Sequence, residues 1–215
     1  MRYLVNLALV AALLAGACAA PPPPAAQNAA SEIAALPRGQ ARVDSVRVLG
    51  PYLEAHVAGN AGRQGFLFAA SAACRAALVD GVVVRLQPVP PLARVITASG
   101  VQCDARGIAN LAAWRDSLPE RRSSFLIPTE PAELRLVSEA PGALIVAGKL
   151  PLALELRWPK PLDLAAVLPD TPACRAHLAR DRTEMEFRAR GEDVLVLRGR
   201  LEPCPVLAIA EPIFL

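Results

Sequence analysis

The side chains of this chain that could do chemistry include five cysteines: Cys18, Cys74, Cys103, Cys174 and Cys204. Structural zinc sites hold closely spaced cysteine pairs of the CxxC type, and the nearest pair here is Cys74 and Cys103. The spacing therefore argues against a metal. An odd number of cysteines predicts one residue with a separate role and four that form two disulfides. Disulfides in turn imply an oxidising compartment such as a bacterial periplasm.

A sequence repeat selects one of the three pairings that four cysteines allow. Residues 71–78 read SAACRAAL and residues 171–178 read TPACRAHL. The first cysteines of the two copies are 100 residues apart and the second cysteines 101. This spacing favours an internal duplication with the disulfides Cys74–Cys103 and Cys174–Cys204. Each closed loop of about 30 residues then stabilises the fold by roughly 3–4 kcal/mol.

The two histidines, His56 and His177, are the candidate general bases. His56 alternates with Glu54 in an expected strand, and His177 follows Cys174 by three residues, so we expect both to be half-buried structural side chains. The sequence contains no nucleophile elbow, no HExxH motif and no phosphate-binding glycine loop. We therefore predict no catalytic residue, no metal and no other cofactor. A hydrolase is the alternative if either histidine meets a serine and an acid in a cleft.

Candidate ligand contacts come from two tryptophans and four arginines. Trp114 and Trp158 could stack on a sugar or a peptide, or they could anchor the core or the seam between the copies. The arginines are expected to make a basic strip on the outer face of a hairpin. This strip could bind an anionic envelope polymer, or it could be a solvated edge balanced by Glu184 and Glu186. The net charge of +3 is too small for a nucleic-acid footprint. The four arginines are Arg188, Arg190, Arg198 and Arg200.

The N-terminus has the plan of a secretory signal peptide over residues 1–17, with Arg2, an apolar stretch and then small residues. The sequence Leu14-Ala15-Gly16-Ala17-Cys18 resembles a bacterial lipoprotein box, although Ala15 stands where Leu is usual. The resemblance implies cleavage before Cys18 and acylation of this cysteine, for example by palmitate. Ala19 in place of Asp implies the outer membrane.

Two other interpretations of the N-terminus stay open. One is a secreted protein cut after Ala19 or Ala20, although a cut after Ala20 would put Pro21 directly after the scissile bond. The other is an uncleaved membrane helix, for which the apolar stretch is shorter than the ~20 residues that a spanning helix needs.

The elements that must position these residues suggest a mainly β (α+β) fold. Residues 18–39 read as a tether, in which Pro21–Pro24 favours an extended spacer. Two tandem β-rich repeats follow, 40–125 and 126–215, each with one short helix and one disulfide. Ser71 and Thr171 are natural N-caps of these helices, and Pro172 suits the first helical position.

The remaining segments are read as strands, with one further helix at 108–118. A hairpin at 183–201 with the loop 191–193 places Glu186 opposite Arg198 and Glu184 opposite Arg200. The other expected strands are 43–49, 52–58, 65–70, 82–86, 92–98, 133–138, 143–148 and 152–158.

These observations predict an outer-membrane-anchored periplasmic lipoprotein with a structural or interaction role. Its partners would be the membrane, through the lipid, and an envelope protein or polymer, with no nucleic acid. One alternative is a ligand-binding module or enzyme inhibitor, which a large groove between the repeats lined by Trp114 or Trp158 would favour. The other is the periplasmic hydrolase. Residues 40–215 resemble no family that we recognise.

The lipoprotein hypothesis makes Cys18 the only lipid site. Metabolic labelling with a fatty-acid analogue should mark the wild-type chain and leave Cys18→Ser unlabelled. Equal labelling of the two chains would contradict lipidation at Cys18.

Overall fold

The computed structural model describes residues 36–60, 62–89, 92–117, 133–149, 163–180, 184–188 and 190–213. Most of these residues are in β-strands, with three short helices, so the chain has the mainly β (α+β) fold that the sequence predicts. The expected signal peptide, Cys18, most of the tether, the strand at 152–158 and Trp158 lie outside the described residues. The described elements are β1 (Gln40–Leu49), β2 (Tyr52–Gly59), β3 (Gly62–Ala69), α2 (Ala72–Ala77), β4 (Val83–Val89), β5 (Leu92–Thr97), β6 (Gln102–Ile108), α3 (Leu111–Ser117), β7 (Glu133–Ala140), β8 (Ala143–Lys149), β9 (Asp163–Pro169), α5 (Pro172–Leu178), β10 (Glu184–Phe187), β11 (Leu195–Arg198), β12 (Cys204–Val206) and β13 (Ala208–Ala210).

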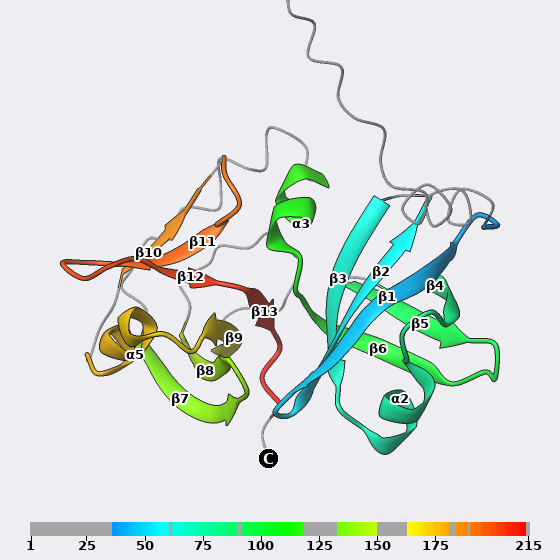
Figure 1. Cartoon of the computed structure of the whole chain (residues 1–215), viewed down its shortest axis with the longest axis horizontal. Coiled ribbons are helices and arrows are strands. Elements are labelled where there is room, and N and C mark those ends of the chain that lie inside the picture. Colours follow the sequence, from blue (N-terminus) through cyan, green and yellow to red (C-terminus); the bar gives the residue numbers. More distant parts are fainter. Residues whose placement is uncertain are drawn as a thin grey trace, which may run out of the picture.

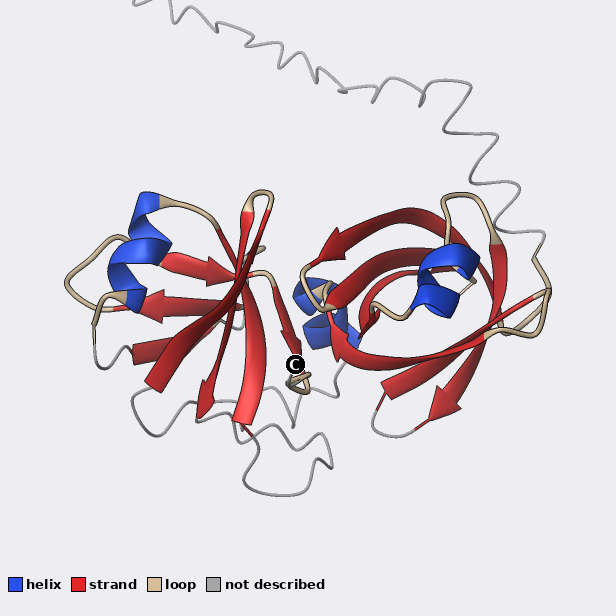
Figure 2. Ribbon diagram, turned by 90° about the horizontal axis from the view of Figure 1, so that it is seen from below, coloured by secondary structure: helices blue, strands red, loops and turns tan. Residues whose placement is uncertain are grey.

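The first half of the chain forms a closed six-stranded antiparallel barrel. Strands β4, β1, β2 and β3 lie side by side in Greek-key order, and β5 and β6 continue from β4. Pairing of β6 with β3, from Phe66 opposite Ile108, closes the ring. Helix α2 lies across the end of the barrel that faces the viewer in Figure 2.

The barrel interior follows the two-residue period of its strands. In β2, Leu53, Ala55 and Val57 are buried in the barrel core, whereas Glu54 and His56 face outward between them. The core also contains both cysteines of the first disulfide. Alternation in the sequence therefore decides which side chains can meet a ligand or another element on the outer face.

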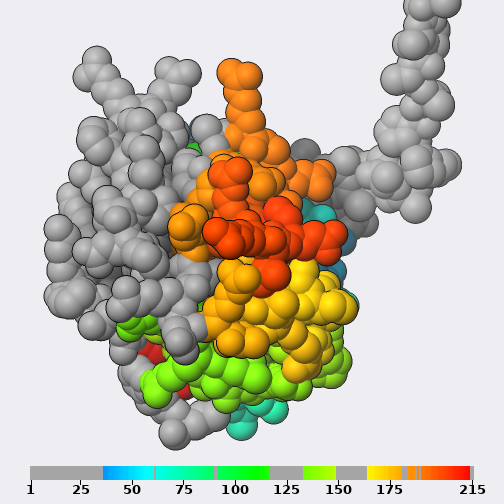
Figure 3. Space-filling view, turned by 90° about the vertical axis from the view of Figure 1, so that its left-hand side faces the viewer, coloured from blue at the N-terminus to red at the C-terminus, as the bar shows by residue number. Residues whose placement is uncertain are grey.

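The described strands of the second half belong to two sheets. Strands β7, β8, β9 and β13 extend the sheet of the barrel, while β10, β11 and β12 form a separate three-stranded sheet. Among the described residues, β10 does not pair with β7 as β4 pairs with β1. Figure 3 shows this half, with β10–β12 in orange to red beside α5 in yellow and β7 in light green.

The two halves share local hydrogen bonds at the helices that carry the first cysteines. The Cys74 amide donates to the Ser71 hydroxyl, and the Cys174 amide donates to the Thr171 hydroxyl, both at 3.2 Å. The Ala70 amide donates to the Pro51 carbonyl oxygen in the turn between β1 and β2. In the same way, the Asp170 amide donates to the Gly142 carbonyl oxygen in the turn between β7 and β8. Both N-cap predictions are confirmed. The duplication itself stays a prediction that these shared bonds support.

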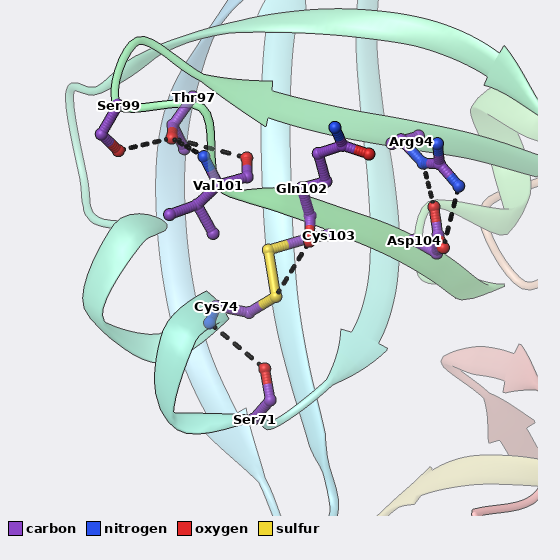
Figure 4. Close-up of a disulfide and its surroundings, with 9 residues drawn as sticks. All are labelled: Ser71, Cys74, Arg94, Thr97, Ser99, Val101, Gln102, Cys103 and Asp104. Carbon is purple, nitrogen blue, oxygen red and sulfur yellow. Dashed lines mark hydrogen bonds and ion pairs between the residues drawn. A yellow bond between two sulfur atoms is a disulfide. The ribbon is translucent and has the colours of Figure 1, made fainter.

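Both predicted disulfides are present, Cys74–Cys103 and Cys174–Cys204. The first joins the helix after β3 to β6, close to the turn that Thr97 and Ser99 stabilise by a hydrogen bond of 2.9 Å (Figure 4). The second joins α5 to β12. Each disulfide therefore ties the helix of one half to the strand that follows it about thirty residues later.

The two halves meet along an apolar seam and through β13, which lies between them in Figure 1. Strand β13 pairs with β6 of the barrel and with β9 of the second half. Beside it the Tyr52 hydroxyl donates to the Glu211 carbonyl oxygen at 2.8 Å and accepts from the Ile213 amide at 3.2 Å. These two hydrogen bonds join the segment after β13 to the first half. The seam residues are Leu49, Tyr52, Leu67, Ala109, Ala143, Ile145, Ala165, Val167, Ala208 and Ala210.

The predicted register of the 183–201 hairpin is wrong by two residues. Glu184 lies opposite Arg198, and Met185 lies opposite Leu197. A shift of two residues keeps each side chain on its expected face, so opposite charges still meet there: Arg198 and Glu186 form an ion pair at 3.0 Å.

The physical reason for the shift is a longer loop, which the Arg188 amide closes by donating to the Val194 carbonyl oxygen. The buried guanidinium of Arg115, on α3, donates to the carbonyl oxygens of Arg188 and Gly191 at 3.2 and 2.8 Å and so holds this loop open. The prediction could not include a cation that reaches the loop from another part of the chain.

Several further expectations need correction. The sequence analysis does not predict strands β6, β9, β12 and β13. Strands β12 and β13 have only three residues each, and β9 has no clear alternation. Strand β6 does alternate, with Gln102, Asp104 and Arg106 between smaller residues, so its pattern was overlooked. The helix expected at 108–118 begins at Leu111, since Ile108 still pairs in β6 with both Phe66 and Ile209. The Asn60 side chain donates to the Leu36 carbonyl oxygen, and the Leu86 amide donates to the Gly39 carbonyl oxygen. The tether therefore ends earlier than residue 39.

The junction between β6 and β13 requires a glycine at position 107. A Cβ there would overlap the Ile209 carbonyl oxygen and lie 2.5 Å from the Ala210 Cβ. We expect Gly107→Ala to lower the free energy of unfolding by about 1–3 kcal/mol, as overpacking does, measured by urea denaturation. Gly199→Ala is the control, because its new Cβ would meet only the Arg180 guanidinium at 3.6 Å. Equal stability of the two variants would show that the halves do not depend on this contact.

Candidate functional site

One cleft between the described residues has a volume of about 320 Å³ and lies at the end of the barrel where β3 begins. Helix α2 follows the other end of β3, so the cleft is at the opposite mouth of the barrel. Its walls are mostly apolar, and none of the described residues that line it is ionisable. The lining residues are Gln64, Gly65, Phe66, Leu86, Gln87, Pro88, Leu92, Ala93, Ile108, Asn110, Ala113 and Trp114.

Helix α3 brings Trp114 to this cleft. The Asn110 side-chain oxygen accepts from the Ala113 amide at 3.1 Å, which starts the helix as an N-cap does. Trp114 also packs against the hydrophobic core of the second half. The indole therefore has two roles at once, because it forms part of the cleft wall and contacts the core of the other half.

A second pocket, of about 450 Å³, lies between the barrel and the second half. Ser45, His56 and Arg63 line it from the barrel, and Glu192 and Asp193 line it from the hairpin loop. Ser45 is the cross-strand neighbour of His56. This pocket therefore contains a serine and a histidine, which is the arrangement that the hydrolase alternative requires.

His56 has its acid partner directly beside it. Its Nε2 lies 2.8 Å from a carboxylate oxygen of Glu54, and Arg47 donates to the other oxygen. Burial raises the pKa of Glu54, but the hydrogen bonds from His56 and Arg47 and their charges outweigh it, so the pKa lies below its ordinary value. The carboxylate, whose side chain is 7% exposed, is thus held ionised by two partners.

The orientation of the His56 ring does not suit a Ser45–His56 pair. Nε2 is directed at Glu54, while Nδ1 and Cε1 lie over Gly65 in β3, where a Cβ would be 3.0 Å from each of them. Ser45 is in β1, on the other side of β2. Neither ring nitrogen is therefore directed at the serine, and a general base must reach the proton that it abstracts. Gly65 lets the imidazole lie flat against the sheet, so the network has a structural role.

His177 is structural as well. It is 1% exposed, and its Nε2 donates to the Glu202 carbonyl oxygen at 2.9 Å. The bond joins α5 to the segment just before Cys204, beside the second disulfide. The imidazole is fully buried and not half-buried as expected, because it lies between α5 and the segment that leads into β12.

The candidate arginines do not share one strand face. Arg198 lies in β11 and pairs with Glu186, whereas Arg190 and Arg200 are exposed outside the strands. Arg188 lies at the base of the loop that Arg115 holds. The structure therefore disperses the expected basic strip.

No cluster of three or more His, Cys, Asp or Glu side chains that could hold a metal ion occurs within the described ranges. Of the helices that the structure describes, none is long and apolar enough to cross a membrane. No protein-family model matches the chain, and no curated protein or solved structure is significantly similar to it.

The sequence analysis singles out Trp114 and His56, but it does not pair His56 with Glu54, and it misses the amides of the cleft. Gln64, Gln87 and Asn110 come from three separate segments, and only Asn110 had a local signal, as a capping residue before an apolar helix. Arg115, which fixes the hairpin loop, had no sequence signal of its own.

The Glu54 network predicts a specific response to acid. Because the folded-state pKa is lowered, the charged carboxylate stabilises the fold above its ordinary pKa of about 4.3, and this stabilisation is lost as the pH falls through the folded-state value. We expect Glu54→Gln to cost about 1–3 kcal/mol of unfolding free energy at neutral pH. The acid decline of stability should also become shallower between roughly pH 5 and 3. Chemical denaturation at several pH values measures both effects, and the exposed Glu202→Gln is the control. Parallel curves for Glu54→Gln and the wild-type chain would disprove the proposed network.

Proposed function

We propose that this chain is a periplasmic lipoprotein, anchored to the outer membrane through Cys18, with an interaction role in the cell envelope. The observation that carries the proposal is the pairing of Cys74, Cys103, Cys174 and Cys204 in two disulfides. Five cysteines minus these four leave Cys18, directly after the signal-like segment, as the one residue available for lipid. Two disulfides also suit an exported protein.

A ligand-binding role is the form of interaction that the cleft favours. Binding sites are concave and mostly apolar, with a few polar groups that fix the ligand, and the Trp114 cleft combines these properties. The cleft lies in the first half and not between the halves, although Trp114 contacts the core of the second. The hydrolase alternative receives less support, because the nitrogens of His56 are directed away from Ser45.

Membrane fractionation tests the anchored role. Wild-type protein should sediment with outer membranes and require detergent for release, whereas Cys18→Ser should be found in the soluble periplasmic fraction or remain as an uncleaved precursor. Thiol alkylation without reduction should label no cysteine in the mature wild-type chain, since four are paired and one is acylated. A mature wild-type chain that is soluble, or that carries a free thiol, would contradict the proposal.

A further inference from the structure

We propose that the Trp114 cleft binds an uncharged saccharide. This inference rests on the proposed binding role and adds the class of ligand. None of the lining residues that the structure describes carries a charge, so this part of the wall offers no counter-ion to an acidic or basic ligand. Burying an unpaired charge is costly, so these walls favour an uncharged ligand.

The polar groups of the cleft are side-chain amides, each of which both donates and accepts hydrogen bonds. Gln87 is exposed, and Gln64 and Asn110 are half-buried. Asn110 uses its oxygen to cap α3, which directs its remaining polar group, the NH₂, to other partners. Hydroxyl groups also donate and accept, so these three amides suit the hydroxyls of a sugar.

The apolar groups suit the other side of a sugar ring. Trp114 is half-buried, and Pro88 and Leu92 add further apolar surface to the walls of the cleft. A pyranose has one face of C–H groups and a rim of hydroxyls. Burying that face against an indole while the rim meets amides satisfies both kinds of surface at once.

An extended peptide fits less well, because it would need backbone partners from a strand edge. The nearest edge belongs to β4, which pairs with β1 only as far as Arg85. The Leu86 amide already donates to the Gly39 carbonyl oxygen, and the next residue on that side is Pro88, which has no N–H. The edge is therefore blocked where a peptide strand would have to add.

Titration of the mature chain in detergent with uncharged tetrasaccharides tests the proposal. The probes are cellotetraose, chitotetraose and maltotetraose, followed by tryptophan fluorescence and calorimetry. At least one should bind saturably with a dissociation constant below about 1 mM, and a tetragalacturonate of the same length should not bind. Trp114→Ala and Gln87→Ala should each weaken binding about tenfold, as for the loss of one aromatic or one hydrogen-bonding contact. Trp114→Phe should retain part of the affinity and controls for misfolding of the alanine variant.

Gln102→Ala is the matched control, since Gln102 is an exposed glutamine on β6 outside the cleft and should bind like wild type. Any of three results would overturn the assignment. The first is that no neutral probe binds saturably. The second is an equal loss of affinity in Gln87→Ala and Gln102→Ala, and the third is Trp114-dependent binding of a proline-rich peptide in place of sugar. None of them affects the fractionation result, so failure of the saccharide assignment is distinguishable from failure of the anchored role.

Discussion

The pairing of β13 with both β6 and β9 is the constraint on which the rest of the molecule depends. It joins the six strands of the barrel to β7, β8 and β9 of the second half in one sheet of ten strands. The approach is close enough that Gly107 has no room for a side chain. Because Tyr52 then binds Glu211 and Ile213, the last described segment returns to the first half, and the seam between the halves is sealed from water.

This junction also places the elements that form the cleft. Helix α3 follows β6 directly, so the position of β6 against β13 determines where Trp114 and Arg115 lie. From the same helix, Trp114 faces the barrel mouth and the second core, and Arg115 holds the hairpin loop of the second half. The cleft is therefore coupled to the packing of both halves, although the described residues that line it belong to the first.

The outer face of the barrel shows how a group of reactive residue types can serve the fold. Glu54 is nearly buried, and its charge is balanced by Arg47 and His56. In return the imidazole is oriented by the carboxylate and lies flat over Gly65. Residue types alone would suggest a Ser/His/acid site, whereas the directions of the ring nitrogens indicate a structural network.

The local features of this protein can be predicted from its sequence. The caps at Ser71 and Thr171 and the faces of β2 follow from residue type and short-range spacing. The disulfide pairs follow from the repeated spacing of the cysteines in the two copies. The closure of the barrel by β3 and β6, the register of the β10–β11 hairpin and the assembly of the cleft could not be predicted in this way. These features depend on contacts between distant segments, such as Arg115 with the 188–194 loop or Gly107 with Ile209, and no local pattern encodes such contacts. Alanine-rich strands such as β9 and β13 carry no alternation of their own, so their place in the sheet is decided by their neighbours.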